Sequence, residues 1–237
     1  TFLSKKQNSS ILYARISPKQ DVLTFLNTTE FTDNQYEHLN DKKWRLLCGE
    51  ERSVISRIEN AGTPIGELYN IAVGIATLKD EAFFITPYSE DETYYFCSNK
   101  YSKQFKVEKS ITRPHVKISA MKSNEDVANN THRIIFPYSV SKGVASVIDE
   151  EVFKKEYPNC YEYLLSVKDV LASRGKGKHK YTPFYAYGRT QGLNKFGVKI
   201  YTPTFSQYPR FLLDENEISL FTNGYGIFYR NPKPTPE

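Results

Sequence analysis

The sequence has few of the residues that staple small proteins or bind metals. Cysteine occurs three times, at distant positions and without a C-x-x-C pair, which argues against a disulfide framework or a zinc knuckle. The four histidines show no metal-ligand spacing. No apolar run approaches the roughly 18 residues that span a bilayer, and the first residues lack the apolar core of a signal peptide. These absences predict a cytoplasmic protein without a membrane span or a metal site.

Sequence patterns of common catalytic sites are also missing. There is no G-x-x-x-x-G-K-[ST] loop and no G-x-S-x-G turn. The tetrapeptide at 182–185 has Thr and Phe where the Asn/Asp/Ser-Pro-Pro-aromatic catalytic loop of adenine methyltransferases has its first residue and its second proline. The stretch 221–226 imitates a glycine-rich cofactor loop, but it lies too near the end of the sequence to open a βαβ unit. We therefore expect no chemistry and no bound cofactor in this chain.

The length and composition indicate one large folded domain, or one domain with an extension. A chain of 237 residues, 39% of them hydrophobic, can bury a sizeable core without staples. It begins without methionine and ends at a proline-rich stretch, which suggests a piece of a longer polypeptide.

Hydrophobic periodicity predicts an α+β fold with a mixed, mainly antiparallel sheet and flanking helices. An apolar stripe predicts a helix over about 41–60, with Thr32 or Asp33 as a helix cap upstream of it. A second helical block covers 150–173 and is divided by Pro158. Short runs rich in β-branched and aromatic residues predict strands at 11–16, 22–26, 69–76, 82–86, 94–97, 104–107, 133–138, 144–148, 198–201, 218–221 and 225–229.

Charge is distributed unevenly although the net charge is only +5. The 37 residues from Arg174 to Arg210 contain eight basic side chains and no acidic one, interleaved with eight tyrosines and phenylalanines. Lysine and arginine neutralise phosphates, and aromatic rings or guanidinium planes stack on bases. The segment has the composition of a polyanion-binding surface, although a basic β-region with core aromatics would have the same composition.

Five motifs occur in one order that a known family shares. They are T-P-I-G-E-L-Y at 63–69 followed by V-G-I-A-T at 73–77 and A-F-F-I at 82–85, E-K-S-I-T-R-P at 108–114, Y-E-Y-L to L-A-S-R over 161–174, F-Y-x-x-G-R at 184–189 with K-I at 199–200, and F-L-L-D to F-T-N over 211–223. In this order they resemble the C-terminal specificity domain of TaqI-type adenine DNA methyltransferases and related restriction-modification enzymes. The chain departs from that family at Leu78, where glycine is common, and at Phe184-Tyr185, where tryptophan is common.

The resemblance implies a division of labour between domains. Residues 1–61 would connect to an N-terminal methyltransferase domain that lies outside this sequence, and residues 62–237 would form the DNA target recognition domain. The covalently linked catalytic domain would bind S-adenosylmethionine and flip the target adenine. The partner of this chain would be double-stranded DNA, and the parent enzyme could also carry a nuclease.

The residues expected to contact DNA come from the basic segment and from two other places. Lysines would contact phosphates, whereas arginine and asparagine can read guanine and adenine with paired hydrogen bonds. The predicted DNA-binding residues are Arg113, Lys117, Arg174, Lys176, Lys178, Lys180, Tyr185, Tyr187, Arg189, Lys195 and Asn223. A stand-alone module for single-stranded nucleic acid or carbohydrate is the alternative, since tyrosine-rich surfaces bind both.

Overall fold

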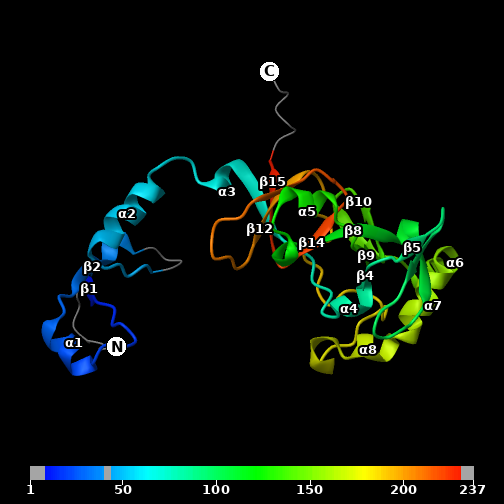
Figure 1. The fold of residues 1–237 in the computed structure, drawn as a ribbon, viewed down its shortest axis with the longest axis horizontal. Coiled ribbons are helices and arrows are strands. Elements are labelled where there is room, and N and C mark those ends of the chain that lie inside the picture. The colour runs from blue at the N-terminus through cyan, green and yellow to red at the C-terminus, as the bar shows by residue number, and fades with distance from the viewer. Residues whose placement is uncertain (1–8, 40–43, 231–237) are drawn as a thin grey trace, which may run out of the picture. The chain divides into compact units, whose positions relative to one another are not determined.

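The computed structural model describes residues 9–39 and 44–230. The chain forms two compact units, which divide between Pro64 and Ile65 (Figure 1). The predicted connector and recognition domain, 1–61 and 62–237, have their boundary close to this point. The roles assigned to the two parts stay predictions.

The smaller unit pairs two short strands and carries two helices. Strand β1 (Ser10–Tyr13) is antiparallel to β2 (Thr32–Gln35), and β2 leads into the 3-10 turn η1 (Tyr36–His38). The strand predicted at 22–26 is wrong, because this segment is the helix α1 (Val22–Thr28). Its start is set by Asp21, whose carboxylate accepts the Thr24 backbone N–H at 2.9 Å. The predicted helix cap at Thr32 or Asp33 is also wrong, since both residues belong to β2.

Helix α2 (Gly49–Glu59) confirms a helix within the predicted range 41–60, of which 41–43 lie outside the described residues. Its apolar stripe is not buried, since Val54 and Ile58 are 51% and 65% exposed. Among the described residues of this unit, Phe25 is the one buried hydrophobic side chain. Because hydrophobic burial is the main favourable term in folding, the smaller unit gains little stability from its own packing.

The larger unit is built on two four-stranded sheets. The first has the strand order β13-β12-β15-β3, and each neighbouring pair is antiparallel. The second has the order β14-β8-β9-β4, in which β14 and β8 are parallel and the other pairs antiparallel. The strands of these sheets are β3 (Tyr69–Val73), β4 (Phe84–Ile85), β8 (Thr112–Lys117), β9 (Arg133–Ile135), β12 (Lys199–Pro203), β13 (Leu212–Asp214), β14 (Leu220–Thr222) and β15 (Gly224–Tyr229). This arrangement confirms the predicted α+β fold with a mixed, mainly antiparallel sheet.

Two smaller antiparallel sheets and several short helices surround these strands. One sheet joins β5 (Ser89–Glu90), β6 (Tyr94–Cys97) and β7 (Phe105–Glu108), and the other is the hairpin of β10 (Tyr138–Ser141) and β11 (Val144–Val147). The helices are α3 (Ile65–Leu68), α4 (Asp80–Phe83), α5 (Asn124–Ala128), α6 (Glu150–Glu156), α7 (Pro158–Ser166) and α8 (Lys168–Ala172), with 3-10 turns η2 (Lys109–Ile111), η3 (Ile118–Ala120) and η4 (Arg174–Gly177). No helix of the described residues is long and apolar enough to cross a membrane.

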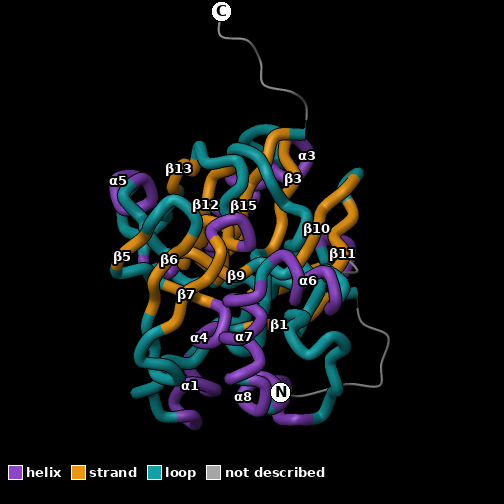
Figure 2. Tube along the Cα trace, turned by 90° about the vertical axis from the view of Figure 1, so that its right-hand side faces the viewer, coloured by secondary structure: helices purple, strands orange, loops and turns teal. Residues whose placement is uncertain are grey.

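Two buried clusters form the core of the larger unit. The bigger one packs α6, α7 and α8 against β4, β7 and β9, and the smaller one lies under the β12–β15 pair and includes Tyr201 and Phe221. Figures 1 and 2 show α7 and α8 at one end of the unit and β12 with β15 at the other. Strand β14 links the two clusters, because Leu220 belongs to the first and Phe221 to the second.

Pro158 divides the helical block as predicted and stands in the first turn of α7. The start of α7 is capped from a distant strand. The buried carboxylate of Glu108 accepts the backbone N–H groups of Asn159 and Cys160, each at 3.0 Å, and the Asn159 amide at 2.8 Å. A carboxylate at this position satisfies orphan donors and favours the positive end of the helix dipole.

We predict that Glu108→Ala lowers the free energy of unfolding by about 1–3 kcal/mol, because it leaves the buried Cys160 N–H and the half-buried Asn159 N–H unpaired. Urea denaturation of the 237-residue chain measures this change. Glu162→Ala, which removes an exposed carboxylate from the same helix, is the matched control. An equal loss of stability in both variants would contradict the capping role.

Candidate nucleic-acid interface

Four chain segments lie side by side where the two large sheets meet, and we call them the crossing. They are residues 115–117, 220–222, 74–76 and 188–189. Strand β8 pairs with β14 in parallel, with Lys117 opposite Thr222. On the other side of β14, the Ile75 N–H donates to the Phe221 carbonyl oxygen at 3.0 Å. The fourth segment is hydrogen-bonded to the third, since the Arg189 N–H donates to the Ala76 carbonyl oxygen at 3.1 Å. The crossing therefore extends the hydrogen-bonded ladder beyond the regular strands.

The close approach of these segments depends on glycine. A Cβ atom on Gly74 would lie 2.2 Å from the Phe221 carbonyl oxygen, and one on Gly188 would lie 2.4 Å from Leu78 Cγ. Leu78 itself has a φ of 59°, a left-handed conformation that favours glycine. The Leu78 side chain occupies the space that a side chain at position 188 would need.

Strand β8 is held to β14 by a buried histidine. The His115 Nε2 atom lies 3.1 Å from Thr222 Oγ1, and the His115 ring packs on Phe84 with ring centres 4.0 Å apart. Burial lowers the pKa of His115 to about 3, so the ring is neutral at pH 7. The hydrogen bond helps to keep Lys117 and Thr222 at the same level of the ladder.

Three of the predicted DNA-binding residues lie on or directly after segments of the crossing and are exposed: Lys117, Arg189 and Asn223. None of the three side chains makes a hydrogen bond or ion pair with another described residue. Asn223 has a φ of 61° in the turn between β14 and β15, a conformation that asparagine tolerates well. Backbone geometry alone therefore suffices to explain an asparagine there, and its amide is also free to contact a ligand.

Tyr185 and Tyr187 do not lie on a DNA-facing surface, and their prediction as DNA contacts is corrected by their burial. Their exposed fractions are 0% and 3%. The Tyr185 hydroxyl donates to the Ile148 carbonyl oxygen at 2.7 Å, and the Tyr187 hydroxyl donates to the Ile135 carbonyl oxygen at 2.5 Å. Both rings belong to the larger core, with Tyr185 stacked on Phe153. The two tyrosines of this stretch are packing residues.

Arg174 is a second correction, because it is 1% exposed although it carries a charge. Its guanidinium donates to the carbonyl oxygens of Leu171, Phe184 and Ala186 and stacks over the Tyr181 ring. These bonds tie the end of α8 to the stretch that follows. Because carbonyl groups occupy its donors, Arg174 stabilises the fold and is not placed to bind a phosphate.

Lys199, another member of the acid-free segment, is also internal. Its amine lies 3.7 Å from the Asp214 carboxylate and donates to the carbonyl oxygens of Gly197 and Asn216 at 2.8 and 2.9 Å. Burial lowers the pKa of Lys199, and the nearby Asp214 opposes that shift. A buried ion pair of this kind joins β12 to β13.

The other predicted contacts remain outside the core. Lys176, Lys178 and Lys180 are exposed and follow α8 in the chain. Figures 1 and 2 show α8 at the other end of the unit from β12 and β15. Lys195 is exposed in the loop before β12. Arg113 is half-buried, and one of its nitrogens donates to the carbonyl oxygens of Ser110 and Thr112.

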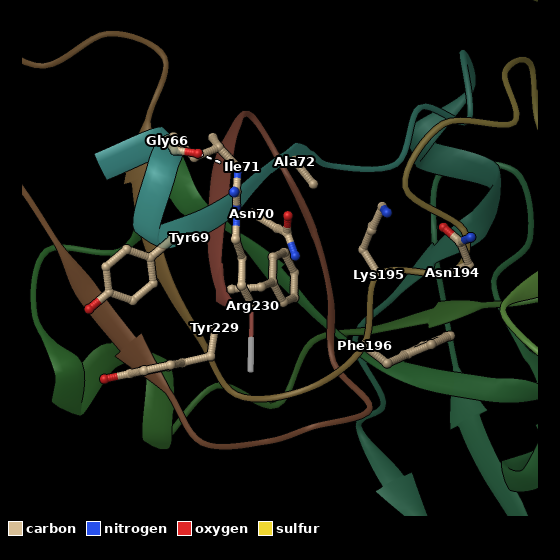
Figure 3. Close-up of a pocket in the computed structure, with 11 residues that line it drawn as sticks. Gly66, Tyr69, Asn70, Ile71, Ala72, Asn194, Lys195, Phe196, Tyr229 and Arg230 are labelled. Carbon is tan, nitrogen blue, oxygen red and sulfur yellow. Dashed lines mark hydrogen bonds between the residues drawn. The ribbon is translucent and has the colours of Figure 1, made fainter. Parts of the chain in front are cut away.

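Sequence patterns gave no sign of a cavity next to Lys195. It measures about 660 Å³ and lies between the β3–β15 pair and residues 194–196 (Figure 3). Asn70, Asn194 and Arg230 line it together with Lys195. No motif marks these residues, because strand register and loop placement bring them together. Among the described residues, no group of three or more potential metal ligands exists.

Comparison with known proteins supports a relation to restriction-modification enzymes. No family model matches the chain. The chain is similar to the type II restriction enzyme and methyltransferase RM.Eco57I of Escherichia coli, with 24% identity over 183 residues. The match covers 72% of this chain but only 18% of that protein. The chain thus corresponds to less than a fifth of the length of a fused restriction and modification enzyme.

We predict that Gly74→Ala lowers the free energy of unfolding by about 1–3 kcal/mol, because the new methyl group forces the Phe221 backbone away. Thermal or urea unfolding of the chain measures the change. Gly66→Ala is the matched control, since a Cβ there has no atom within 4 Å. Equal stability of the two variants would show that the crossing tolerates separation of its segments.

Proposed function

We propose that residues 62–237 recognise a specific double-stranded DNA sequence as the target recognition domain of an adenine-specific methyltransferase or a fused restriction-modification enzyme. Support comes from the similarity to RM.Eco57I and from the motif order shared with TaqI-type specificity domains. The observation that carries the proposal is the crossing, where Lys117, Arg189 and Asn223 are exposed on a hydrogen-bonded framework without internal partners among the described residues. Such a framework limits the loss of conformational freedom on binding.

The three side chains differ in what they can recognise on a duplex. Arg189 can donate two hydrogen bonds to guanine O6 and N7, and Asn223 can pair with adenine N6 and N7. Lys117, opposite Thr222 on β8, can neutralise a phosphate. Lys176, Lys178, Lys180 and Lys195 would add phosphate contacts that position the domain without reading sequence. Arg113 is a weaker candidate, because backbone carbonyls occupy one of its nitrogens.

The chemistry would belong to a covalently linked catalytic domain. That domain would bind S-adenosylmethionine and rotate the target adenine out of the duplex, which costs a few kcal/mol of stacking and pairing. Residues 1–61 would lead from it to the recognition domain. In this arrangement the present chain holds the duplex and selects the site.

A second candidate function rests on a different surface. Phe205, Tyr208 and Phe211 follow β12 and are 89%, 64% and 58% exposed. Exposed rings of this kind can stack on unpaired bases or on sugars, which would suit a module for single-stranded nucleic acid or carbohydrate. The two functions are separated by preference for duplex over single strand and by the salt dependence of binding, which a neutral sugar would not show.

We predict that Arg189→Ala weakens binding to the preferred duplex by about 1–3 kcal/mol and relaxes selection at one base position. The measurement is selection from a randomised duplex library followed by titration of the winning sequence. Arg57→Ala, an exposed arginine on α2, is the matched control and should leave the selected sequence unchanged. If Arg189→Ala selects the same sequence with the same stringency, Arg189 does not read a base.

We further predict that Lys176→Ala combined with Lys178→Ala weakens binding to all duplexes alike. The slope of log affinity against log salt should become shallower by about one for each phosphate that is no longer neutralised. Titration of one specific and one scrambled duplex at several salt concentrations measures both effects. Lys155→Ala, on the exposed face of α6, serves as the control. Weakening confined to the specific duplex would contradict a backbone role.

A further inference from the structure

The cavity beside Lys195 has one wall made of strands and one made of a fixed loop. The strand wall is the antiparallel β3–β15 pair, in which Asn70 lies opposite Phe228 and Tyr69 opposite Tyr229. The loop wall consists of residues 194–196. Figure 3 shows the Asn70 and Lys195 side chains on opposite sides of the space between these walls. Both walls belong to the larger unit.

The loop wall is anchored at both ends. On one side, the Asn194 amide donates to the Gly143 carbonyl oxygen in the β10–β11 hairpin at 2.5 Å. On the other side, the Gly197 N–H donates to the Glu217 carbonyl oxygen at 2.8 Å. The backbone of Lys195 is therefore held in place. Its amine makes no hydrogen bond or ion pair with any described residue.

The residues that line the cavity carry positive charge and no negative charge. Lys195 and Arg230 are cationic, Asn70 and Asn194 are neutral amides, and none of the eleven lining residues is Asp or Glu. Arg230 directly follows β15, and its guanidinium donates to the carbonyl oxygen of Gly66 in α3. Two cations without a carboxylate partner among the described residues, one on each wall, favour an anion between them.

The size and remaining surface of the cavity define the anion further. About 660 Å³ is far more than one phosphate needs and lies in the range of sites for small ligands. Phe196, Tyr69 and Tyr229 add aromatic surface to the lining. We propose that the cavity binds a nucleotide, with its phosphate between Lys195 and Arg230 and its base or sugar against these rings. The nucleotide could belong to DNA, in which case the inference rests on the proposed function, or be free.

The test uses the 237-residue chain and the variants Lys195→Gln and Arg230→Gln, with Lys155→Gln as the control. Deoxyadenosine monophosphate and deoxyadenosine are titrated by NMR or calorimetry, and a labelled duplex is titrated at several salt concentrations. Thermal unfolding confirms that each variant is folded. A phosphate-directed site predicts at least about tenfold tighter binding of the monophosphate than of the nucleoside in the free-nucleotide case.

The outcomes distinguish the sources of the nucleotide. If DNA supplies it, both variants weaken duplex binding for every sequence, and the salt slope becomes shallower by about one per variant. If a free nucleotide is the ligand, both variants no longer bind the monophosphate, and Arg230→Gln keeps duplex affinity. Unchanged duplex and monophosphate binding in both variants would overturn the inference.

Failure of the proposed function is recognisable separately. If the unaltered chain binds no duplex but binds the monophosphate through Lys195 and Arg230, the DNA recognition proposal fails and the cavity proposal stands. If it binds a duplex through Arg189 but the cavity variants change neither duplex nor monophosphate binding, the cavity proposal fails and the DNA recognition proposal stands. If it binds neither probe, both proposals fail.

Discussion

The backbone hydrogen bond between Ile75 and Phe221 is the constraint on which the rest of the larger unit depends. It joins the segment after β3 to β14, and β14 carries side chains into both buried clusters. The two backbones come this close only because position 74 has no side chain. Through Ala76 the same segment fixes the backbone of Arg189, so one close approach both unites the core and positions an exposed guanidinium. The close approach at Gly74 therefore contributes both to the stability of the larger unit and to the position of Arg189 in the candidate interface.

The acid-free basic segment has two physical roles that composition cannot separate. Arg174 and Lys199 are buried, and carbonyl oxygens satisfy their donors, with Asp214 near the second. They are structural charges, costly to bury and stable only with such hydrogen bonding. Arg189 and Lys195, in contrast, are exposed and unpaired within the described residues, as a binding surface requires. The absence of carboxylates from this segment favours an anionic partner for these charges.

The sequence by itself determined the fold class, the division of the helical block at Pro158 and the strands at 94–97 and 225–229. These depend on local signals: periodicity, β-branched and aromatic content, and the missing N–H of proline. The strand predicted at 22–26 is a helix, because the Asp21 cap outweighs strand propensity. Strand β8 was not predicted, because Pro114 interrupts its run of strand-forming residues. In fact β8 pairs with β9 through 112–114 and with β14 only from His115 onward, so the proline is tolerated.

Only the tertiary structure decided which of the candidate residues reach the surface. Tyr185 and Arg189 are four positions apart in one aromatic and basic stretch, yet one fills the core and the other is exposed. The difference arises from long-range contacts, with Phe153 for the tyrosine and with Ala76 for the arginine backbone. The cavity at Lys195 depends likewise on the register of β3 with β15. Local sequence patterns cannot predict these pairings, because each pairing joins segments that lie far apart along the chain.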